Sequence, residues 1–247
     1  MKNYSDSKKL IMLIYTFLIF ILLLLTSVEL FAFNSNSFYI HEFNRHSVLD
    51  KTHPNISIDE ALYIKDEIIM YLKGERNVLS GTIHRESSDI EFLSEREKLH
   101  LSDVKIIVRK YFIFRNFSFI LFCIMTLLLI NDIRHKKNMR DKSLAFIKSA
   151  LLINSFFAII ALLIYSNFDK WFIKLHLLIF DNNNWLLSSD KDNLVNLLPE
   201  AFFEDIIKYS LSLYALFVLI LILINTIYII FTKNKNASQI QESKMFW

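Results

Sequence analysis

Residues 10–33 read LIMLIYTFLIFILLLLTSVELFAF, and this apolar run decides how the rest of the chain is interpreted. An α-helix rises about 1.5 Å per residue, so about 20 apolar residues cross a hydrocarbon core of roughly 30 Å. The run is long enough to do so, and residues 111–130, 144–166 and 206–231 have a similar length and character. The sequence therefore predicts a mainly α-helical protein built on a bundle of four transmembrane helices.

The composition of the whole chain favours the same class of protein. Of its 247 residues 53% are hydrophobic, and the mean hydropathy is +0.35. Only 2 glycines and 2 prolines occur, which indicates a helix-dominated chain. No glycine-rich phosphate-binding motif is present and the net charge is only +3, so we expect neither a nucleotide nor a nucleic acid as partner. The single cysteine, Cys123, lies within an apolar run and excludes a disulfide framework or a zinc site.

Residues 10–33 could instead be a cleaved signal peptide, because Lys8 and Lys9 precede them. However, the apolar run is longer than the core of a typical signal peptide, and residues 28–31 (VELF) do not form a small-residue cleavage site. We therefore expect the first span to be retained.

The distribution of lysine and arginine predicts the orientation of the spans. Basic residues cluster in three segments that fall on one side of the membrane if the spans alternate, and cytoplasmic loops carry the excess of such residues. These are Lys2, Lys8 and Lys9 in residues 1–9, Arg134, Lys136, Lys137, Arg140 and Lys142 in residues 131–143, and Lys233 and Lys235 in residues 232–247. Both termini are therefore predicted to be cytoplasmic, with residues 34–110 and 167–205 outside.

The first outer segment, residues 34–110, has the signals of a small domain. Residues 57–60 (SIDE) form a capping-box pattern that begins a helix, and Gly74 is placed to end it. Residues 77–92 could form an irregular hairpin. A second capping-box pattern, residues 94–97 (SERE), begins a helix that could run almost directly into the second span.

The second outer segment, residues 167–205, contains the pattern of an amphipathic helix. Its apolar residues recur at helical spacing, in the order Phe168, Trp171, Phe172, Leu175 and Ile179. Lys170 and Lys174 lie near this stripe, where their ammonium groups would reach phosphate head groups while their stems stay in apolar surroundings. This arrangement is typical of a helix that lies in the membrane interface.

Histidines are the candidate chemical groups, because the sequence has neither a G-x-S-x-G nucleophile motif nor an H-E-x-x-H metal motif. His100 and His176 are predicted at the outer face of the membrane, each on a helix that abuts it. Each could also be an ordinary interfacial histidine. Asp103 follows His100 at i+3 on the same helical face, where a carboxylate can fix the tautomer of an imidazole. An ion pair of Asp103 with Lys105 or Arg96 is the simpler interpretation.

The remaining titratable residues have plainer interpretations. His135 belongs to the basic cytoplasmic loop, and four histidines in polar outer stretches are expected at the surface, namely His41, His46, His53 and His84. Glu29 is the one acid well inside a span. Its position near the outer boundary fits either a carboxylate at the interface or a polar wall of a site that opens outward.

Two stretches resemble one protein family. Residues 97–105 (EKLHLSDVK) resemble the H-x-x-D-V-K stretch that precedes a span in the Lit-type lipoprotein intramolecular transacylases. Residues 172–203 are similar to the same family in Phe172, Lys174-Leu175-His176, Phe180, Trp185, Asp192-Asn193-Leu194 and Leu198-Pro199-Glu200-Ala201-Phe202-Phe203. The chain departs from the family pattern at Leu101, Leu175 and residues 186–189, where members commonly have Met, His and an Asp-Pro pair. These departures bear on the shape of the pocket more than on the class of reaction.

The resemblance implies an acyltransferase at the outer face of a bacterial cytoplasmic membrane. We expect neither a cofactor nor a metal. The enzyme would move the sn-2 acyl chain of a diacylglyceryl-cysteine lipoprotein from the glycerol oxygen to the cysteine α-amine, giving an N-acyl lyso-lipoprotein. Its partners would be the lipid-modified N-termini of bacterial lipoproteins and the membrane phospholipids.

For this reaction we expect His100 and His176 to face each other as a histidine dyad. One would act as general base on the amine, and the other would stabilise or protonate the glycerol oxygen, with Asp103 orienting His100. The expected substrate-binding residues are Lys105, Phe172, Phe180, Trp185 and Glu29. Three alternatives stay open: a non-catalytic membrane module whose outer domain binds a protein or lipid partner, a transporter, and a metal enzyme that uses the same two histidines and Asp103.

Overall fold

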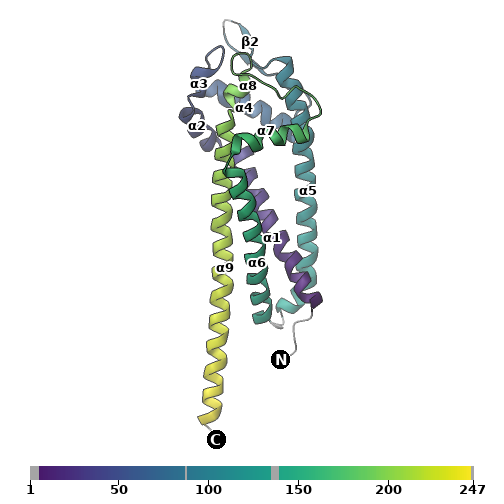
Figure 1. Cartoon of the computed structure of the whole chain (residues 1–247), viewed down its shortest axis with the longest axis vertical. Helices are drawn as coiled ribbons and strands as arrows, with labels where there is room; N and C mark the ends of the chain where they lie inside the picture. Colours follow the sequence, from purple (N-terminus) through teal and green to yellow (C-terminus); the bar gives the residue numbers. More distant parts are fainter. Residues whose placement is uncertain (1–5, 87, 135–138, 246–247) are drawn as a thin grey trace. The chain divides into compact units, whose positions relative to one another are not determined.

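Helices make up most of the computed structural model, which describes residues 6–86, 88–134 and 139–245 (Figure 1). In chain order the elements are α1 (Asp6–Phe33), α2 (Asn36–Arg45), α3 (Val48–Lys51), α4 (Ile58–Lys73), β1 (Thr82–His84), β2 (Asp89–Glu91), α5 (Glu95–Arg134), α6 (Met139–Tyr165), α7 (Phe168–Ile179), α8 (Asn193–Leu197) and α9 (Glu200–Met245). The predicted mainly α-helical fold class is confirmed. His135, assigned above to the basic loop, lies outside the described residues.

Four of these helices are long and apolar enough to cross a membrane. They contain Lys9–Phe33 in α1, Glu95–Ile130 in α5, Met139–Tyr165 in α6 and Glu200–Lys233 in α9. Within their apolar windows, between 6% and 28% of the residues are buried inside the protein. Most of their apolar side chains therefore face outward, which a hydrocarbon solvent tolerates and water does not. The prediction of four helices that are long and apolar enough to span a membrane is confirmed.

Each of the four helices extends beyond its predicted span, and α5 and α9 extend furthest. α5 begins at its capping box, where Ser94 Oγ accepts a hydrogen bond from the Glu97 N–H at 3.4 Å and a Glu97 carboxylate oxygen accepts one from the Ser94 N–H at 2.6 Å. No glycine or proline interrupts the 40 residues of α5, so the outer helix and the span form one helix. α9 likewise begins before its predicted span, directly after Pro199.

The chain divides into two compact units. The span unit comprises residues 1–27, 116–163 and 211–247, and the inter-span unit comprises residues 28–115 and 164–210. The inter-span unit therefore combines the residues of both predicted outer segments.

The core of the inter-span unit joins its two chain segments. Its fully buried apolar side chains include Phe43 from α2, Ile64 from α4 and Leu197 from α8. Phe202, near the start of α9, packs against Tyr39 with ring centroids 5.0 Å apart. Because α2 and α4 belong to the first segment, and α8 and the start of α9 to the second, burial of these side chains fixes the two segments to each other.

The local predictions for the first segment are also confirmed. Ser57 Oγ accepts a hydrogen bond from the Glu60 N–H at 3.2 Å, and the Glu60 carboxylate accepts one from the Ser57 N–H at 2.7 Å. α4 ends at Gly74 with a φ of 81°, a left-handed conformation that glycine adopts at little cost. The predicted hairpin is a short antiparallel sheet of β1 and β2, in which Ile83 lies opposite Ile90.

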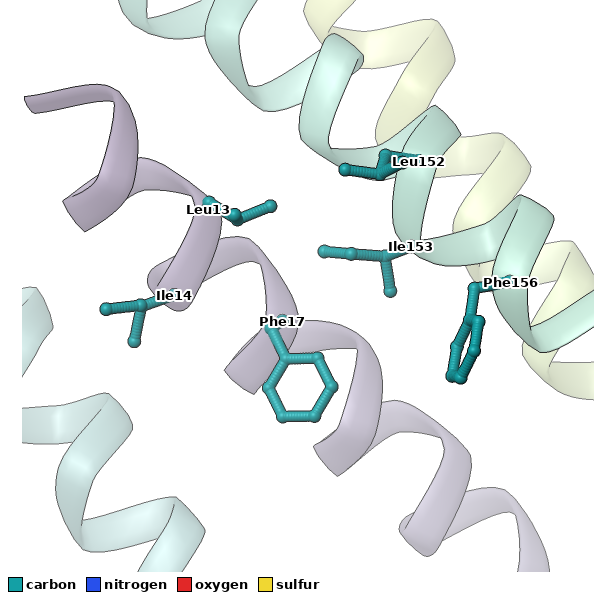
Figure 2. A pocket seen from close by; sticks show the side chains of 6 residues that line it. All are labelled: Leu13, Ile14, Phe17, Leu152, Ile153 and Phe156. Carbon is teal, nitrogen blue, oxygen red and sulfur yellow. The ribbon is translucent and has the colours of Figure 1, made fainter. Parts of the chain in front are cut away.

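Within the span unit, α1 and α6 leave an apolar groove between them (Figure 2). The groove is lined by Leu13, Ile14, Phe17, Leu152, Ile153 and Phe156. Polar groups of this unit bond to one another, as in the hydrogen bond that the Tyr214 hydroxyl donates to Asn154 Oδ1 at 2.7 Å. Such pairing is required where no water is available to satisfy a buried polar atom.

Candidate active site

His100 lies in the first part of α5, before the apolar stretch of residues 111–130. This part of the helix is rich in charged residues, so we place it outside the membrane-spanning segment. Although its neighbours in sequence are polar, the His100 side chain is only 8% exposed. Its Nδ1 is buried without a hydrogen-bond partner among the residues that the structure describes. An imidazole nitrogen held in this way is a polar atom that a bound substrate could satisfy.

His176 is presented by α7, a helix that begins at Asn167. The Asn167 side chain accepts a hydrogen bond from the Lys170 N–H at 3.2 Å and caps the first turn. Two turns later, His176 Nδ1 lies 2.7 Å from the carbonyl oxygen of Phe172. A carbonyl can only accept, so Nδ1 carries the proton and donates it. The lone pair of His176 is therefore on Nε2.

The two imidazoles lie close together in the inter-span unit, with ring centroids 6.1 Å apart and ring planes inclined by 31°. Three of the predicted substrate-binding residues surround them, and we call these residues the aromatic cage. Measured between ring centroids, Phe172 lies 4.4 Å from His176, Phe180 lies 5.2 Å from His100 and 5.6 Å from His176, and Trp185 lies 5.1 Å from His176.

This environment keeps His100 neutral. Burial, together with the nearby His176, lowers the pKa of His100 from its ordinary 6.5 to about 4, against an opposing effect of Asp103. Burial disfavours the charged form of an imidazole because the ion loses its water. At neutral pH the ring is therefore an uncharged group with one N–H donor.

Asp103 does not make the contact that we expected. Its Oδ2 accepts a hydrogen bond from Asn182 Nδ2 at 2.9 Å, and the described part of the chain shows no hydrogen bond between Asp103 and His100. The tertiary structure explains this difference. The turn after α7 brings Asn182 to α5, and the Asn182 side-chain amide, rather than the His100 imidazole, bonds to the Asp103 carboxylate. The i+3 spacing predicted proximity, which the electrostatic effect on His100 reflects, but it did not predict the bonding partner.

Two other predicted binding residues are engaged elsewhere. Lys105 Nζ donates to the carbonyl oxygen of Arg76 at 2.9 Å and lies 3.9 Å from the ring centroid of Tyr71, so it holds α5 against the end of α4. Glu29 lies 3.7 Å from Arg115 in an ion pair. Neither contact, among those the structure describes, involves the histidine pair.

Sequence reasoning missed two residues beside the site. Asn182 is one of three consecutive asparagines, a composition typical of a turn that says nothing about its partner. The second role of Glu97 was also missed. One of its carboxylate oxygens caps α5, and the other accepts a hydrogen bond from the Leu194 N–H at 2.5 Å, which ties the start of α8 to the start of α5.

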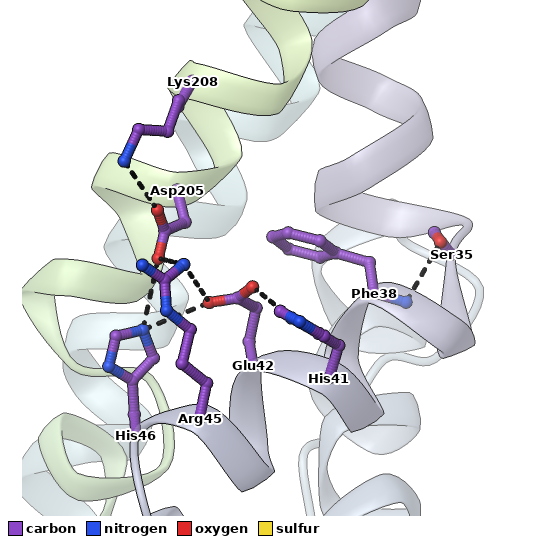
Figure 3. Close-up of polar contacts among 8 residues, drawn as sticks. All are labelled: Ser35, Phe38, His41, Glu42, Arg45, His46, Asp205 and Lys208. Atoms are coloured by element: carbon purple, nitrogen blue, oxygen red, sulfur yellow. Dashed lines mark hydrogen bonds and ion pairs between the residues drawn. The ribbon is translucent and has the colours of Figure 1, made fainter.

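His46 corrects another prediction, because it is not a surface residue. Its side chain is 18% exposed, and its Nε2 lies 3.1 Å from Glu42 Oε2 and 3.3 Å from Asp205 Oδ2 (Figure 3). The start of α9 packs beside α2 and covers it, a contact between residues far apart in sequence. The other predicted surface histidines, His41, His53 and His84, are exposed.

The cluster around His46 has the geometry of a ligand set for a divalent cation. One ligand atom each from Glu42, His46 and Asp205 lie within 4.8 Å of one another. However, Arg45 Nη1 lies 2.7 Å from Asp205 Oδ2 and 3.8 Å from Glu42 Oε2. Because Arg45 pairs with both carboxylates and Lys208 Nζ lies 3.4 Å from Asp205 Oδ1, the arrangement favours an ion-pair network that holds α9 against α2.

Comparison with known proteins identifies a matching protein family. A family model described as "Lipoprotein intramolecular transacylase Lit" matches residues 12–203. A search of curated protein sequences found no match. Among solved structures, that of the membrane integral lipoprotein intramolecular transacylase Lit from Bacillus cereus has 21% sequence identity and a TM-score of 0.65, covering 94% of this chain and 100% of that chain.

Two variants of the Bacillus cereus protein are also similar. One has a histidine replaced by arginine and the other has a histidine replaced by alanine; each has 22% identity, a TM-score of 0.66 and coverage of 92% of this chain. The matches cover 93% and 94% of the two variant chains. At these identities the likeness establishes a shared fold.

Proposed function

This chain belongs to the Lit family of lipoprotein intramolecular transacylases, and from that premise we propose that it N-acylates bacterial lipoproteins with an acyl chain they already carry. The substrate is a lipoprotein whose N-terminal cysteine bears a thioether-linked diacylglyceryl group. The ester bond between the sn-2 acyl carbonyl and the glycerol oxygen breaks, an amide forms with the cysteine α-amine, and one proton passes from the amine to the glycerol oxygen. The reaction needs no cofactor.

The observation that carries this proposal is the histidine pair, because its two imidazoles have different chemical characters. His176 has a fixed Nδ1 proton and a lone pair on Nε2. His100 is buried and stays neutral, with a pKa lowered to about 4. Acyl transfer to an amine requires a base and a donor at the oxygen that becomes negative, and the pair supplies one of each.

His176 is the general base in this mechanism. An α-amine with a pKa of about 7.7–8.0 is mostly protonated at neutral pH and must lose a proton before it attacks. That first proton is released to water. As the neutral amine attacks the ester carbon, His176 Nε2 accepts the second proton that leaves nitrogen. The resulting imidazolium keeps its Nδ1–H bonded to the carbonyl of Phe172, which stabilises the charge. It then returns the proton to the glycerol oxygen as the ester bond breaks.

His100 is the electrophile. A neutral imidazole donates one N–H to the carbonyl oxygen of the ester, which becomes an oxyanion in the tetrahedral intermediate. A neutral donor suits this role because it binds the developing charge without protonating the oxygen outright. Donors placed at the oxyanion in other acyl-transfer enzymes contribute about 10²–10³-fold to the rate.

Orientation supplies much of the remaining rate. The ester and the amine are on one molecule, and holding them in an attacking geometry is worth up to about 7–11 kcal/mol in the best intramolecular reactions. Phe172, Phe180 and Trp185 supply apolar surfaces around the histidines. Such surfaces would exclude the water that could otherwise hydrolyse the ester.

We further propose that the site lies on the extracytoplasmic face, with both termini in the cytoplasm and α7 in the membrane interface. The Lys174 ammonium lies 4.7 Å from the ring centroid of Trp171, and the side chains of Leu177 and Leu178 are 65% and 83% exposed. Aromatic, basic and exposed aliphatic groups on one short helix are what an interfacial helix requires. Membrane phospholipids then surround α7, and the lipid-modified N-terminus of a lipoprotein reaches the histidines from the same surface.

Mass spectrometry of lipoprotein N-terminal peptides tests the function. Cells that produce this protein should change from a free amine with two O-acyl chains to one N-acyl and one O-acyl chain. His176→Ala should slow this conversion about 10²–10⁴-fold, and His100→Ala about 10²–10³-fold. His84→Ala is the matched control, because its side chain is 63% exposed and paired with Asp89. Unchanged N-termini with the wild type would favour a non-catalytic membrane module, and full conversion by His176→Ala would refute the base.

A further inference from the structure

The hydrogen bond between Asp103 and Asn182 joins the two parts of the chain that form the site. Asp103 lies one turn beyond His100 on α5, and Asn182 lies between Phe180 and Trp185 of the aromatic cage. The two side chains are 79 residues apart in sequence and their bond is 2.9 Å long. The bond therefore fixes the direction of the Asp103 carboxylate relative to the cage.

This bond leaves Asp103 available to a ligand. Its Oδ2 is engaged by an uncharged amide, and within the described ranges its other oxygen has no partner and its carboxylate has no ion pair. The cations expected to compete for it are used elsewhere. Lys105 binds the carbonyl of Arg76, and Arg96 Nη2 lies 3.5 Å from the carbonyl of Asn183. A partly exposed carboxylate without a cation thus stands one turn from the histidine pair.

We propose that Asp103 binds the α-ammonium group of the lipoprotein cysteine when the substrate enters, and that Asn182 is the residue that positions it. The inference rests on the proposed function, which makes a primary amine the acceptor. That amine enters mostly as a cation, since its pKa is about 7.7–8.0. A cation that approaches a cage of aromatic rings loses water, and a carboxylate with a free oxygen compensates for that loss.

The proton balance of the reaction stays as described. Asp103 holds the ammonium as an ion pair and takes up no proton. The ammonium releases one proton to water to become the free amine, and the second proton leaves nitrogen for His176 Nε2 as the amine attacks the ester. Asp103 is therefore a binding residue rather than the partner of His100. Because Asp103 bonds to Asn182 and not to His100, His100 Nδ1 has no hydrogen-bond partner among the described residues. Its loss should weaken binding more than it slows the chemical step.

The test uses two ligands that cannot react. Both are cysteinyl peptides with a thioether-linked dialkylglyceryl group, in which ether bonds replace the esters. One has a free α-amine and the other is N-acetylated. Dissociation constants are measured by calorimetry on the purified full chain in detergent at pH 6.5. The quantity of interest is the ratio of the two constants, because it isolates recognition of the ammonium from recognition of the lipid.

The wild type should bind the free-amine peptide about tenfold more tightly or better, the usual scale of a charge-assisted hydrogen bond. Asp103→Asn should reduce this ratio to near one. Asn182→Ala should reduce it in part, because the carboxylate then turns freely. Asn183→Ala is the matched control, since its exposed side chain makes no hydrogen bond among the described residues, and should keep the wild-type ratio.

The pH dependence of the wild-type ratio is a second readout, and it can be measured even if a variant does not fold. In the wild type alone, the ratio should decline as the pH rises above 8, because the free-amine peptide loses its charge. A ratio of one in the wild type at pH 6.5, or a wild-type ratio in folded Asp103→Asn, would overturn the inference. Failure of the wild type to convert the corresponding diester peptide would instead refute the proposed function, so the two failures are distinguishable.

Discussion

Replacing Glu97 by alanine should destabilise the inter-span unit strongly. The Glu97 side chain is 1% exposed, and its two carboxylate oxygens accept hydrogen bonds from the backbone N–H groups of Ser94 and Leu194, at 2.6 Å and 2.5 Å. A hydrogen bond to a charged group contributes about 1.5–3 kcal/mol, and alanine leaves both N–H groups without this acceptor. The expected loss in the free energy of unfolding is therefore about 3–6 kcal/mol.

The matched control for this substitution is Glu95→Ala. Glu95 lies two residues away on the same helix, but its side chain is 82% exposed, and among the described residues its one ion pair is with Lys98 at 3.0 Å. An exposed ion pair contributes about 0–1 kcal/mol. Comparing the two variants separates the buried acceptor from the loss of a negative charge in the first turn of α5.

Thermal unfolding in detergent, followed by tryptophan fluorescence, measures the difference. For a chain of this size, 1 kcal/mol shifts the melting temperature by about 2–4 °C. Glu97→Ala should therefore melt about 6–24 °C below the wild type, and Glu95→Ala within a few degrees of it. A melting temperature for Glu97→Ala equal to that of Glu95→Ala would show that Glu97 does not hold α8 against α5.

Two further predictions concern titration. His176→Ala should raise the pKa of His100 above its value of about 4, because the repulsion from a second imidazole is removed while burial remains. NMR of ¹³C-labelled histidine measures this shift. An unchanged pKa of His100 would show that the two rings are not electrostatically coupled. Arg85, through its hydrogen bond, lowers the pKa of Glu60 from 4.5 to about 2, so the pair stabilises the fold above pH 4.5 and loses this effect as the pH falls toward 2. The difference in melting temperature between the wild type and Arg85→Ala should accordingly narrow over that interval, and a constant difference would contradict the ion pair.

The features that the sequence predicted correctly are those determined by neighbouring residues. A span depends on a continuous apolar run, and a capping box depends on a serine and a glutamate three positions apart. Both capping boxes form, at Ser57 and Ser94. The joining of the outer helix with the second span follows from the absence of glycine and proline in α5, which is also visible in the sequence.

The features that were missed depend on contacts between distant residues. His46 has the sequence environment of a surface residue, and only the return of the chain at Asp205 covers it. Asp103 was assigned to His100 because helical spacing allows that contact, whereas Asn182 lies 79 residues away in a turn without periodicity. Polar side chains give no signal of which distant partner they will find, because any donor of the right geometry can satisfy an acceptor.

The bond from His176 to the carbonyl of Phe172 has a consequence for how the site can tolerate change. In many enzymes a catalytic imidazole depends on a separate acidic side chain for its tautomer, so two residues must be kept together. Here a backbone carbonyl one turn earlier in α7 fixes the tautomer of His176. If His176 is the base as proposed, replacing the surrounding side chains can alter which lipids bind without moving the Nδ1 proton. A helix-breaking residue within that turn would instead remove the hydrogen bond that fixes the proton, although both histidines would still be present.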